Sequence, residues 1–134
     1  MKIQKRVSWL IGISILLILF CSAAMAKEIK IGVIFDYTGP YAAGGSEPGA
    51  VGTKIAIDMI NERGGVEGHM LKAIYADAQS KVEVAINEAE RLLSQEKVDL
   101  LMGLYSSGQC VPLAAKVDAR KKFMWANICE IGRA

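Results

Sequence analysis

KEIKIGVIFDYTGPYAAGG, residues 27–45, followed by SEPGAVGTKIAIDMINERGG, residues 46–65, is the stretch that determines the fold. Residues 27–35 are largely apolar on both alternating faces, which is typical of a strand buried in the middle of a parallel sheet. Glycine and proline make residues 36–45 a loop. Residues 46–63 carry apolar side chains at helical spacing and stop at Gly64-Gly65. The chain therefore begins its folded part with a strand, a loop and a helix.

The rest of the chain continues this alternation. Three further strands are predicted, over residues 71–76, 98–104 and 123–126. Two further helices are predicted, one opening at Ser80 and one over residues 109–120, with Pro112 in the first turn of the latter. Ser80 and Glu83 have the spacing of a capping box, in which each side chain binds the other's backbone N–H.

Strands that alternate with helices predict an α/β fold, an open doubly wound parallel sheet. The right-handed crossover rule and the two-sided burial of the first strand give the strand order 2-1-3-4, with strand two at an edge. This order places a switch point between strands one and three, and ligands of such sheets bind there, outside the carboxyl ends of the strands. The loops 36–45 and 105–110 would flank the resulting crevice.

The N-terminal segment has the three parts of a secretory signal peptide. Three basic residues precede the apolar run Trp9–Phe20, and a segment of small residues then ends in Ala-x-Ala, which predicts cleavage after Ala26. The apolar run is shorter than the roughly 20 residues of a membrane-spanning helix. A retained membrane anchor and a lipidated Cys21 are the alternatives, although Phe20 is large for the position before a lipidated cysteine.

Residues 1–26 also account for the positive charge of the chain. The net charge of +2 becomes −1 without them, because three of the 16 basic residues and none of the 14 acidic ones lie there. We therefore expect no nucleic-acid partner. Two cysteines remain, Cys110 and Cys129, and export permits a disulfide between them without showing that they meet.

The loop 105–110, YSSGQC, has the chemistry of an anion site. It joins a buried strand to a helix, so its backbone N–H groups point into the crevice at the positive end of that helix. Ser106 and Ser107 add hydroxyl groups, and Gly108 allows a ligand to approach the backbone. Ser107 could instead be only the helix N-cap. Tyr41 from the opposite loop, together with Tyr105, would offer aromatic walls with polar tips.

Several catalytic and cofactor motifs are missing from the sequence. Gly52-Thr53-Lys54 has the order of a P-loop reversed, and residues 36–52 contain no G-x-G-x-x-G fingerprint. Neither serine of the loop 105–110 lies in G-x-S-x-G. His69, the only histidine, falls in a turn at the far end of the sheet. We therefore expect no catalytic residues, no metal site and no cofactor.

Taken together, these motifs resemble the amino-terminal lobe of type I periplasmic solute-binding proteins of the branched-chain amino acid (leucine-binding) ABC transporter family. The resemblance covers nearly all of residues 29–127. In chain order it rests on Ile31-Gly32-Val33, Thr38-Gly39-Pro40, Ala56-Ile57-Asp58-Met59-Ile60-Asn61 with Gly64-Gly65-Val66, Tyr75-Ala76-Asp77, Glu90 with Leu92-Leu93, Lys97-Val98-Asp99, and Gly103 with Ser106-Ser107.

The resemblance implies which residues bind the solute. In that family the serine loop binds the α-carboxylate, which implies Ser107 with its neighbours Ser106 and Gly108. The segment after the fourth strand also contacts the ligand, which implies Ala126, Asn127 and Ile128. This segment departs from the family, whose members usually have proline, or serine or threonine with a small residue, at that place.

The resemblance also implies a role and a location. The chain would be the substrate-binding component of an ABC importer, capturing amino acids or related small carboxylates in the periplasm and delivering them to permease subunits of the inner membrane. Residues 27–134 would form only part of the first lobe, because such proteins close two lobes over the solute. A ligand-sensing receptor or amide-binding regulator of the same fold, and a non-functional truncated product, are the alternatives.

Overall fold

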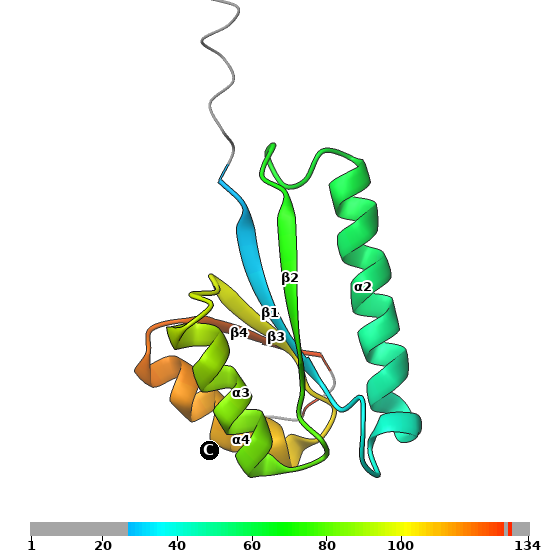
Figure 1. Ribbon diagram of the computed structural model, residues 1–134, viewed down its shortest axis with the longest axis vertical. Coiled ribbons are helices and arrows are strands. Elements are labelled where there is room, and N and C mark those ends of the chain that lie inside the picture. The colour runs from blue at the N-terminus through cyan, green and yellow to red at the C-terminus, as the bar shows by residue number, and fades with distance from the viewer. Residues whose placement is uncertain (1–26, 128, 130–134) are drawn as a thin grey trace, which may run out of the picture.

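The computed structural model describes residues 27–127 and Cys129, which form a sheet with helices on both faces (Figure 1). The predicted signal peptide with Cys21 and Ala26, and the candidate residue Ile128, lie outside the described residues. The strands are β1 (Ile29–Phe35), β2 (Leu71–Asp77), β3 (Leu100–Gly103) and β4 (Phe123–Ala126). The helices are the π-helical turn η1 (Ala42–Ser46), α2 (Glu47–Glu62), α3 (Val82–Ser94) and α4 (Ser107–Ala119).

The sheet has the predicted order, β2-β1-β3-β4, and every neighbouring pair of strands is parallel. The register aligns the carboxyl ends of the strands. Ile34 pairs with both Ala76 and Gly103, and Gly103 pairs with Ala126. The loops that follow the four strands therefore leave the sheet along one edge, with the switch point between β1 and β3.

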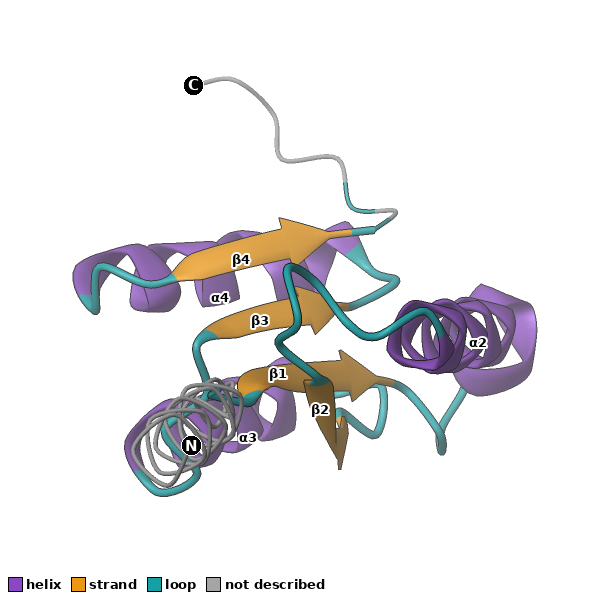
Figure 2. Ribbon diagram, turned by 90° about the horizontal axis from the view of Figure 1, so that it is seen from above, coloured by secondary structure: helices purple, strands orange, loops and turns teal. Residues whose placement is uncertain are grey.

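The helices cover the two faces of the sheet unequally (Figure 2). Helices α3 and α4 pack on one face, where Ile34, Leu92 and Leu101 belong to the larger core cluster. Helix α2 packs on the other face over Ile31, Val33 and Phe35. This doubly wound arrangement confirms the predicted fold class, and the apolar side chains on both faces of β1 explain why that strand is central.

Two local predictions are wrong. Ser80 does not cap α3, because Lys81 is the N-cap residue, and the Lys81 side chain makes no capping hydrogen bond. The Ser80 N–H donates to Asp36 Oδ1 instead, so tertiary contacts take the groups that a capping box would use. Helix α4 begins at Ser107, earlier than expected, and Pro112 therefore lies inside the helix.

Candidate functional site

A strained turn connects β3 to α4 at the switch point. Gly103 has φ +119°, and a Cβ atom there would overlap the Ile34 carbonyl oxygen, so only glycine fits. Leu104 also has a positive φ, 63°, while its buried side chain packs in the core and its N–H donates to the Ile34 oxygen at 2.7 Å. Left-handed backbone at a non-glycine residue costs roughly 1 kcal/mol and is often found at functional sites.

The N-terminus of α4 lies at the carboxyl edge of the sheet, beside the switch point between β1 and β3. Ser106 is the N-cap residue with extended backbone, and its carbonyl accepts the N–H groups of Gln109 and Cys110, each at 3.0 Å. Ser107 and Gly108 form the first two helical positions and are exposed. The alternative that Ser107 is the N-cap is wrong. An exposed N-terminus of a 13-residue helix offers positive potential and backbone N–H groups to an anion.

The loops that follow β1 and β3 contact each other through aromatic rings. The ring centroids of Tyr41 and Tyr105 lie 6.3 Å apart, with the planes tilted by 53°. A Cβ atom at Gly45 would overlap the Tyr105 ring, so this glycine allows the ring to pack against the loop after β1. The structure therefore brings Tyr41 and Tyr105 together beside the start of α4.

The segment after β4 lies next to the same turn. The Asn127 N–H donates to the Gly103 carbonyl at 3.3 Å, and Ala126 pairs with Gly103 in the sheet. The Asn127 side-chain amide reaches Thr53 Oγ1 on α2 at 3.5 Å. Ala126 and Asn127 thus join the candidate residues at the carboxyl edge of the sheet.

A disulfide joins Cys110 in α4 to Cys129 after β4. The two Cα atoms are 6.1 Å apart and 19 residues apart in sequence. Cys110 is fully buried. The sequence left this pairing open, and the structure shows that it connects the serine loop to the segment after the fourth strand.

Asp77 and Ser80 hold the loop after β1 in place, a role that the sequence did not indicate. The Asp77 carboxylate accepts the Thr38 hydroxyl at 2.7 Å and the backbone N–H groups of Tyr37, Thr38 and Gln79 at 2.9–3.3 Å. Ser80 Oγ accepts the Tyr41 N–H at 2.9 Å. Partial burial acts to raise the pKa of Asp77, but these hydrogen bonds outweigh it and lower the pKa below its ordinary value.

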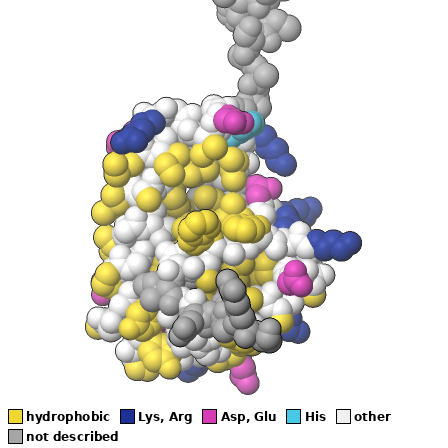
Figure 3. Space-filling view, turned by 180° about the vertical axis from the view of Figure 1, so that it is seen from behind, with side chains coloured by type: hydrophobic (Ala, Val, Ile, Leu, Met, Phe, Trp, Pro, Cys, Tyr) yellow, Lys and Arg dark blue, Asp and Glu magenta, His cyan; other side chains and the backbone are white. Residues whose placement is uncertain are grey.

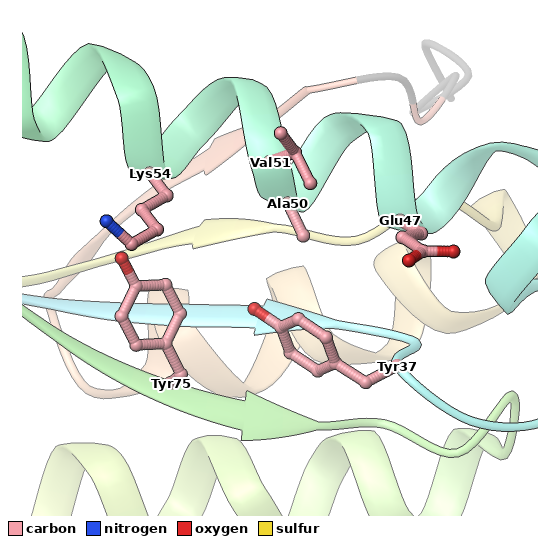
Figure 4. A pocket seen from close by; sticks show the side chains of 6 residues that line it. All are labelled: Tyr37, Glu47, Ala50, Val51, Lys54 and Tyr75. Atoms are coloured by element: carbon pink, nitrogen blue, oxygen red, sulfur yellow. The ribbon is translucent and has the colours of Figure 1, made fainter.

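A separate cavity of about 520 Å³ lies between α2 and the strands β1 and β2 (Figure 4). It is lined by Tyr37, Glu47, Ala50, Val51, Lys54 and Tyr75. Burial, and then the nearby Tyr75 and Asp77, raise the pKa of Tyr37 to about 12, so its hydroxyl keeps its proton at neutral pH. Lys54 is paired with Asp58. None of the described residues of the serine loop or of the segment after β4 lines this cavity, and the α4 N-terminus remains the better candidate for an anionic solute.

The described residues bring no cluster of three or more metal-ligating side chains together. His69 lies in the turn before β2, and its Nδ1 contacts the Lys27 carbonyl oxygen at 2.8 Å. This turn is at the amino end of β2, whereas the serine loop follows the carboxyl end of β3. Within residues 27–127, none of the helices is both long and apolar enough to cross a membrane.

Comparison with known proteins finds similar sequences over most of the chain. A family model described as periplasmic binding protein matches residues 28–129. Leu/Ile/Val-binding protein homolog 7 of Brucella suis biovar 1 is 38% identical over 102 residues, which are 76% of this chain and 25% of that protein. The chain thus spans about a quarter of the length of the curated relatives it matches.

Solved structures share the fold. The branched-chain amino acid transporter substrate binding protein LivJ of Streptococcus pneumoniae, in complex with isoleucine, aligns with a TM-score of 0.75 and 27% identity. The alignment covers 79% of this chain and 30% of LivJ. An ABC transporter solute binding protein of R. palustris, in complex with 4-hydroxybenzoate, aligns with a TM-score of 0.64 and 30% identity, covering 77% of this chain and 27% of that one.

Proposed function

The chain belongs to the periplasmic binding protein family, and we propose that it forms part of the first lobe of the substrate-binding component of an ABC importer. Its solute would be an amino acid or a related small carboxylate. The observation that carries this proposal is the exposed N-terminus of α4, which the strained turn at Gly103 and Leu104 places at the switch point of the sheet.

Each candidate residue has a role in this proposal. The backbone N–H groups of residues 106–108 and the hydroxyls of Ser106 and Ser107 bind the carboxylate of the solute. Tyr41 and Tyr105 line the crevice with aromatic surface. Ala126 and Asn127 form the neighbouring wall, while Ile128 lies outside the described residues. Isoleucine and 4-hydroxybenzoate, which are bound in the two similar structures, both carry a carboxylate group.

The site can be tested by following backbone amide signals in NMR while solutes are added. Isoleucine, leucine and 4-hydroxybenzoate are titrated into isotope-labelled protein, and the matched controls are isoleucinol and 4-hydroxybenzamide, which lack the carboxylate. We expect shifts at Ser107 and Gly108 with a Kd on the order of millimolar, since one half of a site makes few contacts. Equal shifts with the neutral controls, or none at α4, would contradict the proposal.

Two substitutions separate the groups that bind the carboxylate. Ser107→Ala removes the hydroxyl and keeps the N–H. Ser107→Pro removes both, and the helix should tolerate it because proline is favoured at the first helical position and Ser106 is already extended. We expect the proline variant to lose most of the binding and the alanine variant to lose about threefold, the value of one hydrogen bond.

The location of the protein is part of the same proposal. The chain would be exported to the periplasm, cleaved after Ala26, and would deliver its solute to permease subunits of the inner membrane. The family and the pattern of residues 1–26 support this. Expression of the full chain in a Gram-negative host, followed by mass spectrometry of the periplasmic protein, should show a mature chain beginning at Lys27. A retained Met1 or an acylated Cys21 as first residue would contradict it.

A further inference from the structure

Asp36, directly after β1, connects three segments that meet at the carboxyl edge of the sheet. Its side chain is fully buried. Oδ1 accepts the Ser80 N–H at 2.7 Å and Gln109 Nε2 at 2.9 Å. The Asp36 N–H donates to Ser46 Oγ at 2.7 Å. One residue therefore links the residue before α2, the loop before α3 and the first turn of α4.

Gln109 carries this connection into the serine loop. It is the third residue of α4, its side chain is 1% exposed, and its N–H donates to the Ser106 carbonyl. The bond between Gln109 Nε2 and Asp36 Oδ1 spans 73 residues of sequence. It fixes the first turn of α4, with Ser107 and Gly108, relative to the end of β1.

The stability of the fold alone does not explain the Asp36–Gln109 pair. Asp36 Oδ2 and Gln109 Oε1 are buried and have no hydrogen-bond partner in the described part of the chain. Within that part, no lysine, arginine or histidine forms an ion pair with Asp36. A buried carboxylate without a cation, and a buried amide oxygen without a donor, both favour the unfolded chain. Apolar side chains of similar size at such buried positions often give an equal or higher free energy of unfolding.

We propose that Asp36 and Gln109 are a positioning pair, which holds the α4 N-terminus in the orientation that binds the carboxylate of the solute. This inference rests on the proposed function of that N-terminus. The pair does not contact the solute itself, since both side chains are buried. It acts through the direction in which the amides at residues 107 and 108 point.

Three substitutions test the pair. Asp36→Ala removes the acceptor, and Gln109→Leu removes the donor while keeping most of the side-chain volume. Asp36→Asn keeps an accepting oxygen and the shape of the side chain, and its amide adds a donor beside buried acceptors. We expect the first two to weaken solute binding about tenfold per folded molecule, and Asp36→Asn to bind within about twofold of the wild type.

Asn61→Ala is the matched control. Asn61 also ties distant backbone together, donating to the Leu71 carbonyl at 2.8 Å and accepting the Leu71 N–H at 2.7 Å. It does so at the amino ends of the strands, away from the α4 N-terminus. The control should lose stability as Asp36→Ala does, and keep the wild-type affinity per folded molecule, measured after correction for the folded fraction.

The outcomes distinguish this inference from the proposed function. Wild-type binding at α4 together with unchanged affinity in Asp36→Ala and Gln109→Leu would overturn the positioning role, as would an Asp36→Asn variant as weak as Asp36→Ala. Absence of solute binding in the wild type would overturn the proposed function instead. Solute-free amide shifts at Ser107 and Gly108 still test the pair in that case: they should move in Gln109→Leu and stay in Asn61→Ala.

Discussion

Asp77 stabilises the loop after β1 because four groups donate hydrogen bonds to its carboxylate: the Thr38 hydroxyl and the N–H groups of Tyr37, Thr38 and Gln79. All four favour the charged form and lower the pKa of Asp77 against the effect of partial burial. The carboxylate therefore contributes stability at pH values above the pKa of an unfolded aspartate, about 3.9, and this contribution is lost as the pH falls through the lower pKa of the folded protein.

Asp77→Asn should remove this pH dependence. An asparagine can accept fewer of the four hydrogen bonds, and we expect a loss of about 1 kcal/mol at neutral pH, the scale of a partly exposed hydrogen-bonded charge. The difference between the two proteins should shrink on acidification toward about pH 3. Urea unfolding at several pH values measures it. The control is Asp58→Asn, whose ion pair with Lys54 lies on the surface. A constant difference at every pH would contradict this account.

At the scale of elements, the first turn of α4 is held from two sides. Gln109 connects it to Asp36 at the end of β1, and the neighbouring Cys110 connects it to the segment after β4 through the disulfide. The strained backbone at Gly103 and Leu104 sets where the helix begins. Backbone N–H groups keep the orientation of the helix that carries them. An anion site made of these groups therefore requires that the first turn of the helix is held in place.

Cys129→Ser should show how much the disulfide contributes. A bond that closes a loop of 19 residues restricts the unfolded chain, and we expect a loss of about 3 kcal/mol. Urea unfolding with and without a reducing agent gives the measurement. Reduction should destabilise the wild type and leave Cys129→Ser unaffected. Two free thiols in the folded, exported wild-type protein would show that the bond does not form.

At the scale of the whole molecule, one face of the sheet is only partly covered. Helix α2 packs over β1 and β2, while Phe123 and Trp125 on β4 are 59% and 60% exposed. Figure 3 shows the molecule from behind relative to Figure 1, and hydrophobic side chains gather on this side. An apolar face beside an edge strand promotes association.

The purified chain should therefore self-associate. Changing Phe123 and Trp125 together to lysine should shift it toward monomer in sedimentation velocity, because charged side chains disfavour burial of that face. Val66→Lys is the control, since Val66 is 46% exposed in the turn before β2 and should leave association unchanged. A monomeric wild type at all accessible concentrations would contradict the prediction.

Much of the fold could be predicted because its signals are local or follow from chain topology. The apolar residues on both faces of 29–35 made β1 central, and the crossover rule then gave the order of the strands. The glycine and serine pattern of the loop 105–110 indicated the start of a helix. The capping box at Ser80 failed because its backbone N–H and hydroxyl bind residues about 40 positions earlier in the chain.

The sequence by itself determined the elements, their order in the sheet and the edge where the candidate site lies, because periodicity and handedness act over short stretches of chain. Only the tertiary structure decided that Asp36 meets Gln109, that Asp77 and Ser80 hold the loop after β1, and that Cys110 pairs with Cys129. These contacts join residues 19 to 73 positions apart. Their geometry depends on how the strands align and where each helix begins, which no local pattern encodes.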